Sequence, residues 1–247
     1  MGGNESTVRA RELGLALRRA VQAKGMNNAE LAHRLNWSPS KVTNLFKGKR
    51  GAIDTDVAQI LAICGIAGPN RDRLLRLAKE AHQPGWWQEY EDTLPAELRT
   101  LIDHEDSAIA ITEYQAQLVP GLLQIGDYTR EVMRNHATVQ EHEVDERVTA
   151  RLTRQRVFSR QWPARFRFFI DEYALHRTGP GPDIMCEQLH HLLRMSVRPY
   201  IEVRVIPDAV GFHAGTAGPF ILMEFSEINP VVHMENATSS LFAERPG

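Results

Sequence analysis

The stretch NNAELAHRLNWSPSKVTNLFKGKR, residues 27–50, contains two short helical patterns joined by a tight turn. Asn27 or Asn28 can cap the first helix, because both side chains accept hydrogen bonds from the free amide groups at a helix start. Ser38 can cap the second helix, and Pro39 then takes its first position, where the missing N–H does no harm. Two helices joined in this way, the second rich in polar side chains, are typical of a helix-turn-helix.

The second of these helices has one apolar stripe and one polar face. Val42, Leu45 and Phe46 recur at spacings of three and four residues, so we expect them to be buried. The opposite face suits a DNA major groove, since Asn can pair with adenine, Lys with guanine, and a Thr methyl with a thymine methyl. Residues next to the helix ends can reach phosphates. We therefore predict DNA contacts from Asn28, Ser38, Ser40, Lys41, Thr43, Asn44, Lys47, Lys49 and Arg50.

The charge is distributed unevenly along the chain. Residues 1–53 contain ten Lys and Arg against three Asp and Glu, a net charge of +7, whereas residues 54–247 carry −9. A basic N-terminal segment favours a polyanionic partner such as double-stranded DNA. Two alternatives stay open at this point: a solvated basic face with no partner, and a helical bundle used for protein contacts.

Apolar periodicity extends the helix-turn-helix into a bundle of five short helices over residues 8–81. The first helix covers residues 8–24. Asp54 or Thr55 can cap the fourth helix, which Gly65 closes, and a fifth can run from Pro69 to Ala81. We expect residues 1–81 to form the helix-turn-helix domain and residues 82–100, rich in Pro, Trp and acidic residues, to form a connector.

Residues 101–247 mix strand and helix patterns. RFRFFI at 165–170 and IEVRVI at 201–206 alternate as strands do, and PFILMEF and PVVHMEN are further strand candidates. Helical patterns cover Glu141 to Arg160 and Ile184 to Ser196. The fold class that follows is a mainly α N-terminal five-helix bundle, then an α+β C-terminal domain with a small sheet. We expect this second domain to dimerise and to receive a signal.

The segment AELAHRLNWSPSKVTNLFKGKR, residues 29–50, resembles the N-terminal domain of lambda-repressor-like regulators of the xenobiotic-response-element family. The resemblance implies a recognition helix at SPSKVTNLFKG. It also implies a homodimer on a two-fold symmetric operator.

Five blocks of the remaining chain resemble the C-terminal domain of a large actinobacterial family. Members of that family couple a helix-turn-helix to this domain, and they include WhiJ-like developmental regulators and antitoxin-like regulators. The blocks are PGWW at 84–87, LVPGLLQIGDYTREVM at 118–133, DERVTARLTRQ at 145–155, CEQLHHLL at 186–193 and HAGTAGPFILMEF at 213–225.

No pattern typical of catalysis is present in the sequence. His190 and His191 are adjacent, so they point to different faces of a helix, and neither has a partner at a metal-ligand spacing. Consecutive carboxylates at Asp171 and Glu172 point apart on a strand. The GPGP segment has prolines where a phosphate loop needs N–H groups. We expect no enzyme activity, no cofactor and no metal site.

A sensing pocket in the second domain is the more plausible site for a small-molecule ligand or a small protein partner. Large aromatic side chains can line an apolar cavity, although for any single one of these residues a place in the core is the favoured interpretation. The candidate lining residues are Trp86, Trp87, Tyr114, Tyr128 and Phe212.

The cysteine pattern and the absence of targeting signals predict a cytoplasmic protein. Cys64 and Cys186 lie within apolar patterns, which favours small core residues in a reducing compartment. No apolar run approaches the roughly 18 residues that cross a bilayer, and the N-terminus has no apolar signal core.

The predicted function is a dimeric, sequence-specific transcriptional regulator whose C-terminal domain senses a ligand or a partner protein. The alternative is an antitoxin-like protein that binds and neutralises a small toxin and autoregulates its own operon.

Overall fold

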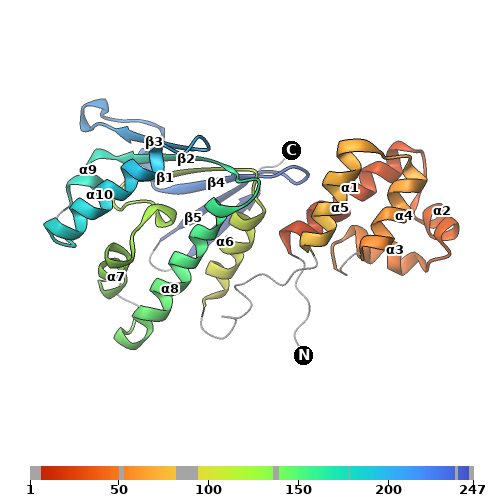
Figure 1. The fold of residues 1–247 in the computed structure, drawn as a ribbon, viewed down its shortest axis with the longest axis horizontal. Coiled ribbons are helices and arrows are strands. Elements are labelled where there is room, and N and C mark those ends of the chain that lie inside the picture. Colours follow the sequence, from red (N-terminus) through yellow and green to blue (C-terminus); the bar gives the residue numbers. More distant parts are fainter. Residues whose placement is uncertain are drawn as a thin grey trace. The chain divides into compact units, whose positions relative to one another are not determined.

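The computed structural model describes residues 7–49, 53–81, 94–135, 139–177, 179–236 and 239–244. The chain folds as two compact units, Met1–Glu89 with Ser226–Ile228, and Tyr90–Phe225 with Asn229–Gly247. The first unit is helical and the second combines helices with one sheet (Figure 1). This arrangement confirms the predicted fold class, a mainly α region followed by an α+β region.

The first unit is a helical bundle with a single apolar core. Its described residues form α1 (Val8–Ala23), α2 (Asn28–Leu35), α3 (Pro39–Phe46), α4 (Asp54–Cys64) and α5 (Gly68–Ala81). Each helix contributes the stripe expected from its periodicity, so the five helices bury one another's apolar faces. The core includes Leu13, Leu17, Val21, Leu31, Ala32, Val42, Leu45, Phe46, Val57, Ile60, Leu61, Cys64, Leu74 and Ala78.

The start of α4 differs from the prediction. Its N-cap residue is Ile53, which makes no side-chain cap hydrogen bond, so neither Asp54 nor Thr55 caps the helix. Asp54 and Asp56 instead lie in the first turn. Negative charge is stabilising there, because the helix dipole presents its positive end.

Gly14 lies where α1 packs against the C-terminal end of α3. A Cβ atom at this position would lie 2.6 Å from the carbonyl oxygen of Phe46 and 2.7 Å from that of Leu45. A glycine inside a helix costs roughly 0.5–1 kcal/mol relative to alanine. The close approach of the two backbones explains why the position has no side chain.

The second unit is built on a six-stranded sheet with the order β3-β2-β1-β4-β5-β6. β1 pairs with β2, and β2 with β3, in parallel, whereas the remaining neighbours are antiparallel. The sequence patterns predicted β2, β3, β4 and β5 but not β1 or β6. The strands are β1 (Ala110–Gln115), β2 (Arg165–Asp171), β3 (Ile201–Ile206), β4 (Phe220–Glu224), β5 (Val231–Glu235) and β6 (Ser240–Glu244).

Helices cover one face of this sheet. Parallel strands need crossover connections, and these have a fixed hand, so the helices between β1, β2 and β3 fall on the same face. Figure 1 shows α6, α7 and α8 together on that side. The helices are α6 (Ala96–Ser107), α7 (Gly126–Arg134), α8 (Val144–Arg154), α9 (Glu172–His176) and α10 (Pro182–Ser196).

Three details of the second unit differ from the sequence patterns. α6 already begins at Ala96, within the expected connector, and residues 82–93 of that segment lie outside the described residues. The predicted helical stretch from Glu141 to Arg160 is divided into α8 and two flanking 3-10 turns. Cys186 is exposed on α10, so it is not the core residue we expected, whereas Cys64 is buried.

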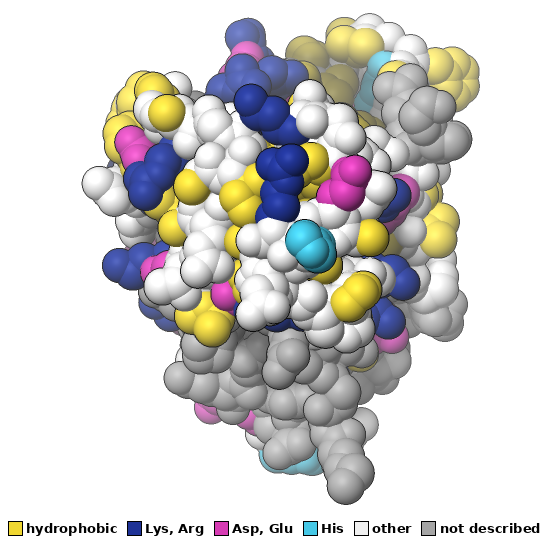
Figure 2. Space-filling view, turned by 90° about the vertical axis from the view of Figure 1, so that its right-hand side faces the viewer, with side chains coloured by type: hydrophobic (Ala, Val, Ile, Leu, Met, Phe, Trp, Pro, Cys, Tyr) yellow, Lys and Arg dark blue, Asp and Glu magenta, His cyan; other side chains and the backbone are white. Residues whose placement is uncertain are grey.

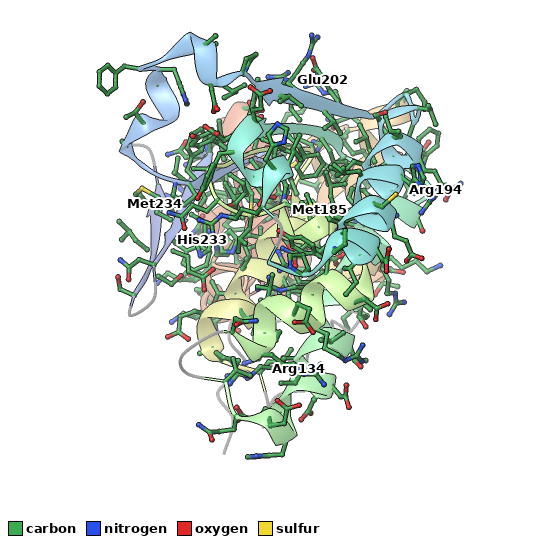
Figure 3. The ribbon with its side chains drawn as sticks, turned by 90° about the vertical axis from the view of Figure 1, so that its left-hand side faces the viewer. Arg134, Met185, Arg194, Glu202, His233 and Met234 are labelled. Carbon is green, nitrogen blue, oxygen red and sulfur yellow. The ribbon has the colours of Figure 1, made fainter. Side chains whose placement is uncertain are left out.

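Strand alternation separates the covered face from the outer face. On β5, His233 points inward and its neighbour Met234 points away from the molecule (Figure 3). His233 is 3% exposed and Met234 is 41% exposed. The same alternation places Ile111 and Glu113 of β1 on the helix-covered face, in register with the buried Phe166 and Phe168 of β2.

A buried ion pair lies on the helix-covered side. The Arg154 guanidinium of α8 donates to both carboxylate oxygens of Glu105 on α6, at 2.9 and 2.5 Å. Both side chains are almost fully buried. Such a pair is bidentate and fully satisfied, so it fixes α8 against α6 without leaving a charge uncompensated.

Glu113 lies close to this pair, and its carboxylate is less well satisfied by hydrogen bonds than that of Glu105. Its side chain is 2% exposed, and one carboxylate oxygen has no hydrogen-bond partner among the described residues. Burial raises the pKa of Glu113 to about 7, and the hydrogen bond from Gln115 opposes this rise. The neighbouring Glu105 raises the pKa further, and Arg154 lowers it.

Replacement of Gly14 by alanine should destabilise the first unit by about 1–3 kcal/mol, because a methyl group would overlap two backbone carbonyls of α3. Chemical denaturation measures this loss directly. Gly126→Ala is the matched control, since a Cβ there meets only a Leu152 methyl group at 3.5 Å. Equal stability of the two variants would contradict the close approach.

The Glu113 pKa predicts how stability depends on pH. A native pKa raised above the unfolded value means that the folded state binds more protons, so stability falls as pH rises from about 4.5 to 7. The loss from this group is on the order of 3 kcal/mol. Glu113→Gln should therefore be more stable than the wild type at pH 8, with most of that advantage gone at pH 5. Thermal unfolding at both pH values checks this, and Glu187→Gln, an exposed position on α10, should show no such difference.

Candidate nucleic-acid interface

Side-chain caps define where α2 and α3 begin. Asn27 caps α2, accepting from the Glu30 amide at 2.9 Å, while Glu30 accepts from the Asn27 amide at 2.9 Å. Of the two expected candidates, Asn27 is therefore the cap, and Asn28 takes the first helical position. Ser38 caps α3 by accepting from the Lys41 amide at 3.2 Å, with Pro39 next to it as predicted.

The turn between the two helices depends on Asn36. This residue has a φ of 54°, in the left-handed region, and is the C-cap of α2. Asn tolerates this conformation better than most residues do. Only Trp37 then separates Asn36 from the Ser38 cap, so the chain turns within two residues and α3 starts directly after α2.

The buried stripe of α3 is the predicted one. Val42, Leu45 and Phe46 all lie in the core of the bundle. This fixes the rotation of the helix, so the remaining positions face outward. Figure 2 looks onto the side that carries α2, α3 and α4 in Figure 1, and Lys and Arg side chains extend from the top of this face toward its centre.

The predicted contact residues differ in exposure. Arg50 lies outside the described residues. Lys41 and Thr43 are half-buried. The other six predicted residues are exposed, namely Asn28, Ser38, Ser40, Asn44, Lys47 and Lys49.

Lys41 is held by two partners that sequence reasoning did not identify. Its Nζ donates to the Asp56 carboxylate of α4 at 2.9 Å. The same atom lies 3.7 Å from the centroid of the Trp37 ring, a cation–π geometry. The Lys41 amine therefore has an acceptor within the protein, and it sits near the start of α3 without needing a phosphate there.

Several hydroxyl groups on this face already have partners. Thr43 Oγ1 donates to the Pro39 carbonyl at 2.9 Å. The hydroxyls of Ser38 and Ser40 lie 3.0 Å apart. Asn44 is different: it is exposed, and within the described ranges no group is hydrogen-bonded to its side-chain amide. Its donor and acceptor remain open for a base edge.

The aromatic residues expected to line a sensing pocket are not brought together. Tyr114 lies on the outer face of the sheet beneath Gly215, whereas Tyr128 lies on α7 and accepts a hydrogen bond from the Val119 amide. Phe212 is 96% exposed. Trp86 and Trp87 lie outside the described residues.

Tyr114, Tyr128 and Phe212 therefore do not line a common cavity, contrary to the prediction. The physical reason is strand alternation, because the residue before Tyr114 faces the helices and Tyr114 itself must face the other side.

Metal-ligand clusters and membrane-spanning helices are both absent from the part of the chain that the structure describes. It contains no group of three or more His, Cys, Asp or Glu side chains that could hold a metal ion. None of its helices combines the length and the apolarity that a membrane-spanning segment needs.

A capped helix pair with a tight turn and an exposed polar second helix defines a DNA-binding regulator of the helix-turn-helix class. Family comparison agrees, since residues 12–74 match the model described as a helix-turn-helix domain. Residues 98–247 match the model described as a domain of unknown function, DUF5753. The chain therefore belongs to the DUF5753 family and carries a helix-turn-helix domain ahead of it. No curated protein and no solved structure matched the sequence.

Of the two partners of Lys41, only Trp37 could have been predicted from the sequence. Trp37 and Lys41 are four residues apart, a spacing at which side chains meet along a helix and its cap. The Asp56 carboxylate comes from α4, fifteen residues away along the chain. No local pattern could have paired it with Lys41.

A double-mutant cycle can test the Lys41 anchor. Lys41→Met, Asp56→Asn and the double variant should give a coupling energy of about 1 kcal/mol, since the pair is only partly exposed. Urea unfolding supplies the four free energies. A coupling energy near zero would mean that the ammonium and the carboxylate do not meet in solution.

Proposed function

We propose that this protein is a sequence-specific transcriptional regulator that binds DNA as a homodimer, with the exposed face of α3 in the major groove. The observation that carries the proposal is this face: a capped helix, rigid on its buried side, that presents Asn44, Lys47 and Ser40 outward. Asn side chains suit adenine and Lys suits guanine or phosphate. The uneven charge of the chain supports the same partner.

Within this proposal, the residues around the α3 face divide into two kinds of contact. Asn44 and Thr43 lie where base edges would be reached. Lys47 and Lys49, with Arg50 after them, would contact phosphates, as would the free amides beside Asn28 at the start of α2. Lys41 acts mainly as a positioning residue, because its amine is already bound to Asp56.

The second unit supplies dimerisation and a response to a signal in this proposal. A ligand can change DNA binding only through a difference in its affinity for two arrangements of the protein. No feature of the described residues favours the antitoxin-like alternative, so we do not propose it.

The proposal is tested by capturing genomic DNA with purified full-length protein beside an Asn44→Ala variant. A palindromic site should be enriched by the wild type, and the variant should bind it about 5- to 100-fold more weakly, as expected for loss of one base contact. Asn44 is preferable to Lys41 for this test, because a Lys41 variant would leave Asp56 without its partner.

Gln22→Ala, which removes an exposed amide from α1, is the matched control and should capture the same site as the wild type. Enrichment that stays at the salt-sensitive background for the wild type would contradict the proposal. It would favour instead the use of the bundle for protein contacts.

A further inference from the structure

A cavity of about 360 Å³ lies within the second unit, lined by residues of α6 and α8 and by the strands β5 and β6. Its volume falls within the range of small-molecule sites. It shares no residue with the aromatic set predicted from the sequence. Its walls differ in character, and the difference indicates what it can hold.

One wall of the cavity is apolar. Leu98 and Leu101 of α6 contribute to it, together with Met133 of α7 and Val139. An apolar wall of this kind favours a ligand with a hydrocarbon body, because burial of that body removes apolar surface from water. A compact, fully hydrated anion would gain nothing from it.

Another part of the lining is formed by three arginines of α8. Arg147, Arg151 and Arg154 follow one another at spacings of four and three residues, so they share one face of the helix. All three line the cavity. A wall of guanidinium groups favours a ligand that carries an acid group.

The three arginines differ in how many hydrogen-bond and ion-pair partners they have. Arg154 donates two hydrogen bonds to Glu105. Arg147 pairs with Glu143 at 3.3 Å, but its buried Nε has no partner among the described residues. The one hydrogen bond of Arg151 within the described ranges is long, 3.5 Å from its Nη1 to Gln124 Oε1.

Among the residues that the structure describes, no carboxylate therefore pairs directly with Arg151. Glu97 and Glu235 also line the cavity, yet within the described ranges no carboxylate oxygen lies within 4.0 Å of an Arg151 nitrogen. Burial lowers the pKa of Arg151 to about 10, and the positive charge of Arg154 lowers it further, whereas the carboxylates of Glu235, Glu113 and Glu105, which are not in direct contact with it, raise it. A partly buried guanidinium that makes no direct ion pair carries a desolvation cost, and a ligand carboxylate at hydrogen-bond distance would offset that cost.

Hydrogen bonds hold the segment next to Arg151 in place. The VPGLLQ segment supplies Gln124, which is 2% exposed and donates to the Val119 carbonyl at 2.8 Å. Gln188 of α10 holds the same segment by donating to the Leu123 carbonyl at 2.7 Å and accepting from the Ile125 amide at 2.8 Å. A fixed second layer of this kind orients the arginine before a ligand arrives.

We propose that this cavity binds a small organic carboxylate, whose acid group pairs with Arg151 and whose hydrocarbon body lies against Leu98, Leu101 and Met133. The planar fork of a guanidinium matches a carboxylate in bidentate fashion. Such a ligand would be the signal of the second unit. Its effect on DNA therefore rests on the proposed function, whereas its binding does not.

Octanoate is the probe, because it combines one carboxylate with an apolar chain. Isothermal titration of the full-length wild type should show saturable octanoate binding, accompanied by a rise in melting temperature. 1-Octanol, which lacks the charge, and inorganic phosphate, which lacks the chain, should show no saturable binding. Failure of octanoate to bind, or equal binding of 1-octanol, would overturn the proposal.

Two variants show whether octanoate binding depends on Arg151 itself or only on the positive charge of the protein. Arg151→Gln should bind octanoate at least tenfold more weakly, and its melting temperature without ligand should stay close to that of the wild type, since only one long hydrogen bond and no direct ion pair of the described residues is lost. Arg156→Gln, an exposed arginine just beyond α8, is the matched control and should bind as the wild type does. Undiminished octanoate binding by Arg151→Gln would reject this site.

The same preparations also show which of the two proposals fails. Octanoate binding without DNA enrichment would sustain the cavity and contradict the regulator. DNA enrichment without octanoate binding would support the regulator and contradict the ligand site.

Discussion

The distance between α1 and the end of α3 is the constraint on which the candidate DNA-binding face depends. With no Cβ at Gly14, the carbonyl oxygens of Leu45 and Phe46 come close to the α1 backbone. The Ser38 cap fixes the other end of α3. Burial of the apolar stripe of α3 in the core then sets the rotation of the helix about its axis. The outward direction of Asn44 is therefore a consequence of packing. A helix placed in this way can read a groove without a further entropic cost for its own ordering.

Ion pairs distinguish structural charges from available ones in both units. Lys41 is bound to Asp56, and Arg154 is bound to Glu105, so these charges hold neighbouring helices together. Arg151 belongs to the same helix as Arg154, but within the described ranges no carboxylate oxygen lies within 4.0 Å of its nitrogen atoms. The sequence shows three similar arginines in DERVTARLTRQ, and only their partners in space separate an anchor from a candidate ligand contact. The VPGLLQ segment has a structural role in this scheme, because Gln124 lies against Arg151.

Local patterns predicted the helical unit well and the second unit less well, for physical reasons. Capping residues, helix-ending glycines and apolar periodicity are local, and so α2 and α3 could be located within about a residue. The partner of Lys41 and the position of Tyr114 depend on contacts between distant segments and on strand pairing, which no single stretch encodes. β1 was missed because its burial on both faces, with Glu113 and Tyr114 side by side, removes the usual alternation. The cavity was missed because its arginines look like an ordinary solvated helix face.

The exposed face of α3 is the surface that we propose meets DNA. This proposal is tested most directly by an NMR titration of the isotope-labelled protein with a duplex carrying the captured site, following the backbone amides. If the exposed face of α3 meets DNA, the largest chemical-shift changes should fall on residues 38–49 and on the first turn of α2, with smaller changes across the sheet of the second unit. Changes confined to the second unit, or spread evenly over both units, would contradict it.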